Sequence, residues 1–339
     1  MKRFLSLLLL LLVLTGCTVQ MQTPSEPMDG LTVHFLDVGQ ADCTLLQCDG
    51  RNMLIDGGNV DDSDLVVSYL LEQGVDKLDL VVNTHAHEDH VGGLPAVLAV
   101  FETTELWCPV TEYDSKCFED FLYYADQQDL TLECPYPGDT YALGNAEVTV
   151  LGPIRDDYDT NDTSIVLRVE YGDTAFLFSG DAELEAEKDI LDAGFDISAT
   201  VMKAGHHGSS TSNSYRWLRE ANADYVVIPV GTDNSYGHPH KEVLSRFRDA
   251  GMTVYRTDQQ GHIVCWSDGT GVTFTTLKQA AVTNPTQKTE EYFIGNKNSG
   301  VFHLPSCGSL PSEKNRVEFY SYEMLFLRAT LPTALAWNN

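Results

Sequence analysis

Three histidines and Asp89, all able to bind a metal ion, lie within six residues in the segment Thr84-His85-Ala86-His87-Glu88-Asp89-His90. Imidazole nitrogens and carboxylate oxygens both bind borderline divalent ions such as Zn²⁺ and Mn²⁺ once they are deprotonated. One short loop cannot easily wrap four ligands around a single ion. We therefore expect two neighbouring ions, one held by His85 and His87 and the other by Asp89 and His90.

Three later segments carry residues of the same chemical kinds. They are Ser179-Gly180-Asp181, Gly205-His206-His207-Gly208-Ser209 and Gly237-His238-Pro239-His240. Each follows a predicted strand, which is where sheet-based folds build their sites. The spacing therefore predicts that residues far apart in the chain form one site.

The elements that must position these motifs are strands first, and then strands that alternate with helices. An almost continuous apolar run at 78–83 predicts a strand buried on both faces, which leads directly into the histidine motif. Other strands are expected at 32–38, 43–48, 52–55, 164–170, 174–178, 199–203 and 225–230. Helices are expected at 64–73, 182–193 and near 214–221.

Six ordered segments of the chain resemble the metallo-β-lactamase-fold hydrolases, over most of residues 31–277. The segments are Phe35–Asp42, Leu54–Gly58, the histidine motif with Gly92-Gly93-Leu94, Phe178–Asp181, Lys203–Ser209 and Tyr236–His240. Within that superfamily the chain is most similar to the soluble hydrolase domain of ComEC-type DNA-uptake proteins. The resemblance implies an α+β fold, a four-layered αββα sandwich, with two divalent ions, Zn²⁺ or Mn²⁺.

The resemblance also implies roles for single residues. Asp181 is expected to bridge the two ions, and the His206–His207 pair to supply a ligand to the ion of Asp89 and His90. We favour His206 as that ligand, although the sequence cannot separate the two. The expected metal ligands are thus His85, His87, Asp89, His90, Asp181 and His206. Three further acids are expected chiefly to orient imidazoles, with metal binding as the alternative: Asp37, Asp42 and Asp56.

One feature departs from the broader superfamily, which has a further histidine ligand before the Asp181 strand. Here no histidine lies between His90 and His206, and Asn161-Asp162-Thr163-Ser164 occupies that place. The ion of His85 and His87 therefore lacks a ligand. Asp162, Asn161, water or substrate could supply it, and an oxygen-tolerant ion such as Mn²⁺ would suit this second site.

The implied reaction is hydrolysis by a metal-activated hydroxide, which Asp89 or Asp181 can orient. His238 is expected to bind the substrate phosphate or to protonate the leaving group, which makes Asp89, Asp181 and His238 the catalytic residues. Lys203 and Ser209 are expected to add phosphate contacts. The favoured substrate is a phosphodiester such as DNA. The alternatives are another envelope substrate, such as phosphocholine-decorated teichoic acid, and a non-catalytic binding protein on the same fold.

The first residues indicate a targeting segment. Lys2 and Arg3 precede an apolar run at 4–14 that is short for a membrane span, and Leu14-Thr15-Gly16-Cys17 resembles a bacterial lipobox. We expect a lipoprotein signal peptide at 1–17, lipidation of Cys17 and a tether at 18–30. This places the protein on the extracytoplasmic face of a bacterial membrane, attached through its lipid anchor only. No transmembrane channel is expected in this chain.

The hydrolase domain is expected at 31–278, followed by a linker at 279–290 and a small module at 291–339. The segments Tyr292–Ser299 and Phe302–Cys307 resemble an Ada-type metal-binding-like module. The cysteine-containing end of such a module is missing, so we expect it to be incomplete. Beyond Cys17, seven cysteines remain without a Cys-x-x-Cys pair, and most are expected to be buried and unpaired.

The charge limits how a polyanion could bind. The chain carries 21 Lys+Arg against 50 Asp+Glu, a net charge of −29, which excludes tight, sequence-blind coating of DNA. Residues 111–162 hold thirteen acids and two basic residues, and we expect a surface insertion there. Residues 200–262 hold seven basic residues and six acids. A phosphodiester is therefore expected to meet the protein only at the metals.

Overall fold

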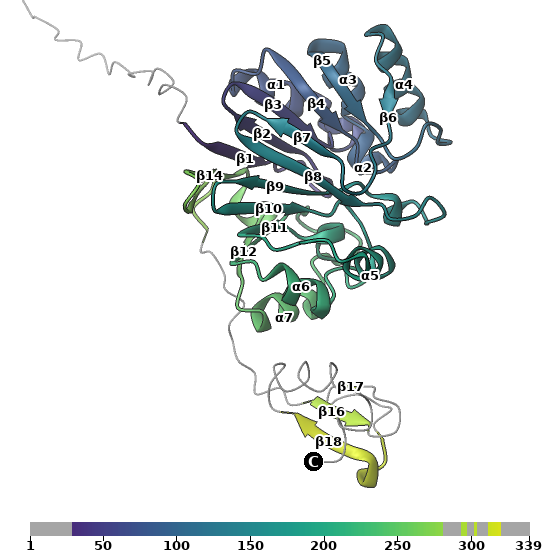
Figure 1. Ribbon diagram of the computed structural model, residues 1–339, viewed down its shortest axis with the longest axis vertical. Helices are drawn as coiled ribbons and strands as arrows, with labels where there is room; N and C mark the ends of the chain where they lie inside the picture. The colour runs from purple at the N-terminus through teal and green to yellow at the C-terminus, as the bar shows by residue number, and fades with distance from the viewer. Residues whose placement is uncertain (1–28, 281–292, 297–301, 304–310, 320–339) are drawn as a thin grey trace, which may run out of the picture.

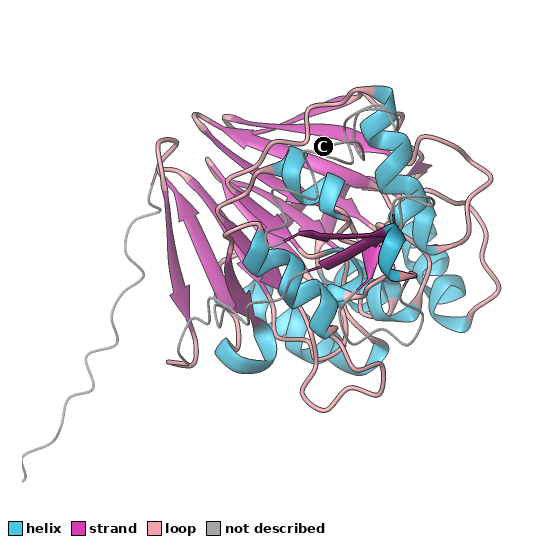
Figure 2. Ribbon diagram, turned by 90° about the horizontal axis from the view of Figure 1, so that it is seen from below, coloured by secondary structure: helices cyan, strands magenta, loops and turns pink. Residues whose placement is uncertain are grey.

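The computed structural model describes residues 29–280, 293–296, 302–303 and 311–319. Within these residues, two large sheets pack face to face and helices cover the outer face of each (Figures 1 and 2). The predicted α+β fold, an αββα sandwich, is confirmed.

The first sheet has the strand order β15-β14-β1-β2-β3-β4-β5-β6. Its strands are β1 Leu31–Phe35, β2 Thr44–Cys48, β3 Arg51–Ile55, β4 Lys77–Val82, β5 Glu102–Trp107, β6 Leu132–Glu133, β14 Ile263–Ser267 and β15 Val272–Thr276. The helices on its outer side are α1 Ser63–Glu72, α2 Glu88–Val91, α3 Leu94–Val100 and α4 Lys116–Gln127. Their apolar faces, among them Phe118 and Phe121, are buried against this sheet.

The second sheet has the strand order β13-β12-β11-β10-β9-β8-β7. Its strands are β7 Thr140–Leu143, β8 Ala146–Gly152, β9 Val166–Tyr171, β10 Thr174–Phe178, β11 Val201–Lys203, β12 Tyr225–Ile228 and β13 Thr253–Arg256. The helices that cover its outer side are α5 Leu184–Ala193, α6 Tyr215–Ala221 and α7 Lys241–Asp249. Trp217 of α6 and Phe247 of α7 are buried between these helices and the sheet. A short helix, α8 Thr257–Gln260, follows β13.

A third apolar layer lies between the two sheets. It contains inward-facing side chains of both, such as Phe35 and Ile55 from the first sheet and Val148 and Phe176 from the second. Burial of this much apolar surface on both faces of each sheet is the main favourable term in folding. The strands that carry the motifs are therefore held rigidly from both sides.

The segment 111–162 is not the surface insertion that the sequence suggested. It contains α4, which contributes Phe118 and Phe121 to the core, and the strands β6, β7 and β8. Its acids alternate with buried apolar residues, as in β8, where Val148 and Val150 are buried and Glu147 is exposed. The prediction was wrong because the charge count concealed this alternation, which is typical of a strand with one solvent-facing side.

Strand ends deliver the motifs to one region of the molecule. The histidine motif follows β4, Asp181 follows β10, and two short 3-10 helices, Asn161–Thr163 and Gly205–Gly208, precede β9 and follow β11. Gly57 links these parts: its N–H donates to the carbonyl of His90 at 2.7 Å. A Cβ at this position would lie 2.7 Å from the backbone nitrogen of Leu94, so only glycine fits.

The expected signal peptide, most of the tether and nearly all of the linker lie outside the described residues. Of the C-terminal module, the described part forms a small sheet of order β17-β16-β18, from Phe302–His303, Phe293–Asn296 and Arg316–Phe319; Cys307 falls outside it. The described cysteines are unpaired and, except for Cys134, buried. Among the helices that the structure describes, none has the length and apolar character needed to cross a membrane.

Candidate metal centre

Four side chains from three separate segments converge on one point: Asp89, His90, Asp181 and His207. Their ligand atoms all lie within 4.8 Å of one another. Oδ2 of Asp181 lies 3.4 Å from Nε2 of His90 and 3.7 Å from Nε2 of His207. Nε2 of His207 is also 3.3 Å from Oδ2 of Asp89.

Buried atoms at this point lack partners within the protein. Nε2 of His90 and Oδ1 of Asp181 are both buried without a hydrogen bond, which is costly for polar atoms. Nδ1 of His90 lies 2.8 Å from Oδ2 of Asp56, a carboxylate that can only accept, so the ring's Nε2 lone pair faces Asp181. Two carboxylates and two imidazoles so arranged fit a divalent cation.

The carboxylates and imidazoles of the group shift one another's pKa values toward the charged forms. Burial opposes ionisation of Asp181, but His90 and His207 outweigh it and hold the pKa of this carboxyl well below its usual range. Burial likewise opposes a charged His90, yet the carboxylates of Asp181 and Asp56 raise the pKa of this imidazole well above its usual value. A cation, whether proton or metal, is thus strongly favoured between these residues.

His85 and His87 form a second pair beside this group. Nε2 of His85 lies 3.1 Å from Nδ1 of His87, and the rings of His85 and His90 are 4.1 Å apart between centroids. Burial, together with His90, holds the pKa of His85 well below its usual value. A neutral imidazole is the form that binds metal.

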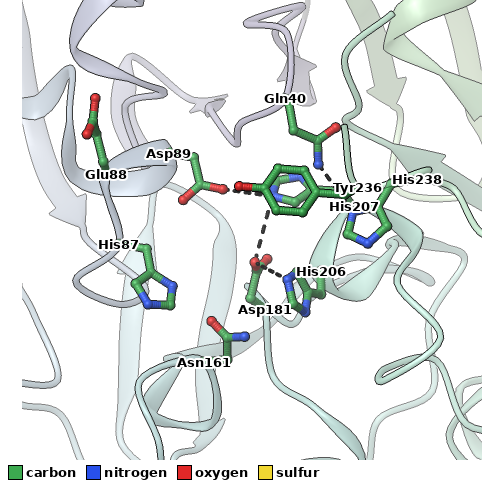
Figure 3. Close-up of a pocket in the computed structure, with 10 residues that line it drawn as sticks. All are labelled: Gln40, His87, Glu88, Asp89, Asn161, Asp181, His206, His207, Tyr236 and His238. Atoms are coloured by element: carbon green, nitrogen blue, oxygen red, sulfur yellow. Dashed lines mark hydrogen bonds and ion pairs between the residues drawn. The ribbon is translucent and has the colours of Figure 1, made fainter. Parts of the chain in front are cut away.

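Asn161 and Asp162 were the alternatives for the missing ligand, and the structure gives them different surroundings. The Asn161 side chain lines the cavity below His87 and Asp181 (Figure 3), and its Oδ1 is buried without a hydrogen bond. Asp162 does not line this cavity, and its Oδ1 accepts from the N–H of Glu183 at 2.6 Å, at the start of α5. Asp162 thus caps a helix, whereas Asn161 keeps a free oxygen at the site.

The two adjacent histidines also differ. Both adopt a left-handed backbone, with φ of 50° and 52°, and the turn sends their rings in different directions. His207 is almost fully buried, with Nδ1 3.1 Å from the carbonyl of Pro229, and it joins the group of four. His206, the ligand favoured from the sequence, lies outside that group: its Nε2 is 3.5 Å from Oδ2 of Asp181, but its Nδ1 is 3.2 Å from Oε1 of Glu183.

Lys203 does not have the surroundings expected of a phosphate-binding residue. It is buried, and its Nζ lies 2.5 Å from Oδ2 of Asp42 and donates to the carbonyls of Gly180 and Ala204 at 3.0 and 2.9 Å. These contacts use all three ammonium protons. Burial disfavours a charged Asp42, but Lys203 and then His207 lower the pKa of this acid to about 2.

The remaining predicted residues divide into two sets. Asp42 has Oδ1 3.4 Å from Nδ1 of His207, and Asp56 contacts His90, so both lie against imidazoles. Asp37 instead pairs with Lys278 at 3.3 Å, and it is not among the residues whose ligand atoms converge. Ser209 is buried and contacts Thr211 through its hydroxyl at 3.0 Å, without lining the cavity.

A cavity of about 320 Å³ opens over these groups (Figure 3). Its lining residues are Gln40, His87, Glu88, Asp89, Asn161, Asp181, His206, His207, Tyr236 and His238. Gln40, Glu88 and Tyr236 were not among the candidate residues, although all three belong to segments that carry the family resemblance. Gln40 and Tyr236 are not usual metal ligands, and the Glu88 carboxylate, within the histidine motif, was assigned to neither ion.

His238 is held by Gln40. The Gln40 Oε1 accepts from the N–H of Gly231 at 3.2 Å, which orients the amide, and its Nε2 lies 3.3 Å from Nδ1 of His238. Nδ1 is therefore the acceptor, and a neutral ring carries its proton on Nε2. Burial and the neighbouring His206 and His207 lower the pKa of His238 to about 4.

Two family models match the chain. The model described as Metallo-beta-lactamase superfamily matches residues 36–231, and that described as Prokaryotic membrane lipoprotein lipid attachment site matches residues 1–18. The second match confirms the predicted lipoprotein segment.

Among curated proteins, ComE operon protein 3 of Bacillus subtilis (strain 168) is 28% identical over 250 residues, which are 68% of this chain and 32% of that protein. Competence protein ComA of Neisseria gonorrhoeae is 29% identical over 246 residues, 72% of this chain and 33% of that protein. The chain thus spans about a third of the length of these relatives. Among solved structures, the metallo-beta-lactamase fold protein YhfI from Bacillus subtilis has a TM-score of 0.49 at 15% identity, covering 70% of this chain and 100% of YhfI.

Proposed function

The chain belongs to the metallo-β-lactamase superfamily, and from that premise we propose that it is a metal-dependent phosphodiesterase that acts on nucleic acid. The observation that carries the proposal is the convergence of Asp89, His90, Asp181 and His207 beneath an open cavity. The superfamily implies divalent ions, often two. The competence proteins to which the chain is homologous favour DNA among phosphodiester substrates.

In this proposal Asp89, His90, Asp181 and His207 would hold one ion, Zn²⁺ or Mn²⁺. His85 and His87 would hold the second, with Asp181 and the Asn161 oxygen as further ligands. When bound, such ions lower the pKa of water to about 7 and stabilise charge that develops on phosphoryl oxygens. His207 takes the role first given to His206, because its Nε2 faces Asp89 as well as Asp181, whereas His206 contacts Asp181 and Glu183.

His238 acts on the substrate rather than on the metals. Because Gln40 occupies Nδ1, the neutral ring presents its Nε2–H as a donor. This N–H can donate a hydrogen bond to a phosphoryl oxygen or to the leaving-group oxygen, where negative charge develops. Gln40 is thus a positioning residue, since it sets the tautomer of His238.

The electrostatics make substrate binding depend on the metals. Asp89, Asp181 and Glu88 line the cavity and repel a phosphodiester. Lys203, the nearest buried cation, is already neutralised by Asp42. We infer that the cavity accepts a phosphodiester only when cations occupy it, and that the protein is displayed by its lipid anchor on the extracytoplasmic face.

Hydrolysis assays test this function. Protein loaded with Mn²⁺ or Zn²⁺ is offered single-stranded DNA, duplex DNA and bis(p-nitrophenyl) phosphate, beside the variants Asp181→Asn and Asp37→Asn. We expect hydrolysis that chelation abolishes, that Asp181→Asn reduces at least about 100-fold and that Asp37→Asn retains. Absence of hydrolysis on all three substrates with either ion would overturn the proposal. Hydrolysis confined to a phosphocholine ester would show an envelope substrate instead.

A further inference from the structure

Tyr236 stands at the mouth of the cavity with most of its side chain exposed, 67% of the residue. Its ring stacks on that of His238, with 5.6 Å between centroids and 23° between planes. His238 in turn stacks on His207 at 6.3 Å and 26°. A row of three rings, each tilted by 23–26° from its neighbour, therefore leads from the candidate metal group out to solvent.

The loop that carries this ring is held in place. The Asn234 side chain bridges it, because Nδ2 donates to the carbonyl of His238 at 2.7 Å and Oδ1 accepts from the N–H of His238 at 3.0 Å. Nε2 of His240 lies 3.3 Å from the carbonyl of Tyr236, while Nδ1 accepts from the N–H of Ser210 at 2.9 Å. The exposure of Tyr236 is thus built into an ordered loop.

We propose that Tyr236 is a stacking platform for a nucleobase adjacent to the scissile phosphate. The inference rests on the proposed phosphodiesterase function and adds how the substrate is recognised. An exposed aromatic ring that does not pack into the core can bury its apolar face by stacking on a planar group of a ligand. Nucleobases stack on tyrosine whatever their sequence. The phosphate would lie over the metal group and the base over the exposed ring.

Two features favour a nucleobase over other groups. A quaternary ammonium such as choline is usually held in a cage of several aromatic rings, whereas the only tyrosine among the described residues lining this cavity is Tyr236. The cavity, about 320 Å³, is at the small end of the range for ligand pockets. It suits one nucleotide unit of a single strand, whose bases are free to stack, and the net charge of −29 disfavours longer contact.

The experiment compares two monoesters of equal charge that differ only by the base: thymidine 5′-monophosphate and 2-deoxyribose 5-phosphate. Calorimetric titration of each into the Mn²⁺-loaded protein gives the ratio of their dissociation constants. We expect the nucleotide to bind about 10-fold more tightly. We expect Tyr236→Ala to bring the ratio close to 1 and Tyr236→Phe, which keeps the ring, to preserve it.

Tyr136→Ala is the matched control, because this tyrosine is also exposed, at 75%, and does not line the cavity; it should keep the wild-type ratio. Equal binding of the two esters by the wild type, binding of neither, or an unchanged ratio in Tyr236→Ala would each overturn the inference. So would tighter binding of phosphocholine than of the nucleotide. Hydrolysis of bis(p-nitrophenyl) phosphate by the same preparations reports on the proposed function separately.

Discussion

Nδ1 of His90 lies 2.8 Å from Oδ2 of Asp56, and both side chains are fully buried. The same carboxylate accepts from the backbone N–H and the hydroxyl of Thr84, each at 2.7 Å. Asp56 is therefore fixed by Thr84 and in turn fixes the His90 ring, with its lone pair on Nε2 toward Asp181. Such supporting carboxylates orient a histidine ligand and raise its basicity.

The first prediction concerns this support. Asp56→Asn keeps the shape and tolerates the positive φ of 58° at this position, but it weakens the hold on the His90 proton. We expect metal affinity to fall about 10–100-fold, measured by calorimetric titration with Zn²⁺. Asp37→Asn, at a surface ion pair with Lys278, is the control and should leave the affinity unchanged. Equal affinities for the two variants would contradict the role of Asp56.

The second prediction separates the adjacent histidines. His207→Ala removes a side chain from the group of four, so the tightly bound ion should be lost or its affinity lowered by more than about 100-fold. This is a larger fall in affinity than the loss of a residue that only supports a ligand would cause. His206→Ala should retain the ion, because this ring lies outside the group. Metal content after dialysis measures both. Loss of the ion in His206→Ala, with retention in His207→Ala, would restore the assignment that the sequence favoured.

The third prediction concerns the second ion. Asn161→Ala should weaken only the lower-affinity of two Mn²⁺ sites, because its unpaired Oδ1 is removed. Asn161→His should favour Zn²⁺ over Mn²⁺ there, since imidazole replaces an oxygen ligand. Asp162→Ala is the control: it removes the contact to Glu183 N and should cost about 1 kcal/mol of stability without changing either metal site. A single Mn²⁺ per chain at full activity would rule out the second site.

The fourth prediction sets two roles of Lys203 against each other. Lys203→Met removes the nearest positive charge from the buried Asp42, so the free energy of unfolding should fall by about 3–5 kcal/mol, and Lys203→Met/Asp42→Asn should recover part of it. Lys188→Met, at an exposed lysine, should leave it nearly unchanged. Urea unfolding measures all three. Wild-type stability with a raised KM would instead show that Lys203 binds substrate.

The sequence predicted which segments meet but not how each side chain is used. Strand ends position whole motifs, so the spacing of His85 to His90 and the place of Asp181 were readable from strand-like runs. The choice between His206 and His207 depends on two consecutive left-handed residues, which no periodicity encodes. Nor does local sequence show that Lys203 faces Asp42, 161 positions earlier in the chain.

The segment 111–162 shows that the composition of a segment does not predict which of its residues are buried. Its acids dominate the composition, but burial depends on which side chains alternate inward, and Val148 and Val150 do so in β8. Asn161 and Asp162 then differ by one position in a short 3-10 turn, which points one toward the cavity and the other toward the start of α5. The net charge of a segment therefore indicates how acidic its exposed surface is, but not which of its side chains reach the cavity.

The last prediction concerns a buried acid that supports the turn of His207. Glu187 accepts from the N–H groups of Asn213 and Ser214 at 2.5 and 2.9 Å, and Asn213 in turn binds Gly205 through Oδ1 and Nδ2, each at 2.9 Å. Burial outweighs these contacts and raises the pKa of Glu187 from 4.5 to about 7. A raised pKa in the folded state means that the native protein holds a proton which the unfolded chain has already released.

The stability from this proton is therefore fully present below about pH 4.5 and is lost as the pH rises through about 7. Relative to Glu187→Gln, the wild type should lose roughly 3 kcal/mol of unfolding free energy between pH 4.5 and 8. Urea unfolding of both proteins at several pH values measures this, and the effects of groups common to both cancel in the difference. Glu185→Gln, at an exposed residue of the same helix, should give a constant offset from the wild type. Parallel curves for wild type and Glu187→Gln would show that Glu187 is ionised throughout, and that the turn carrying His207 is held by a carboxylate.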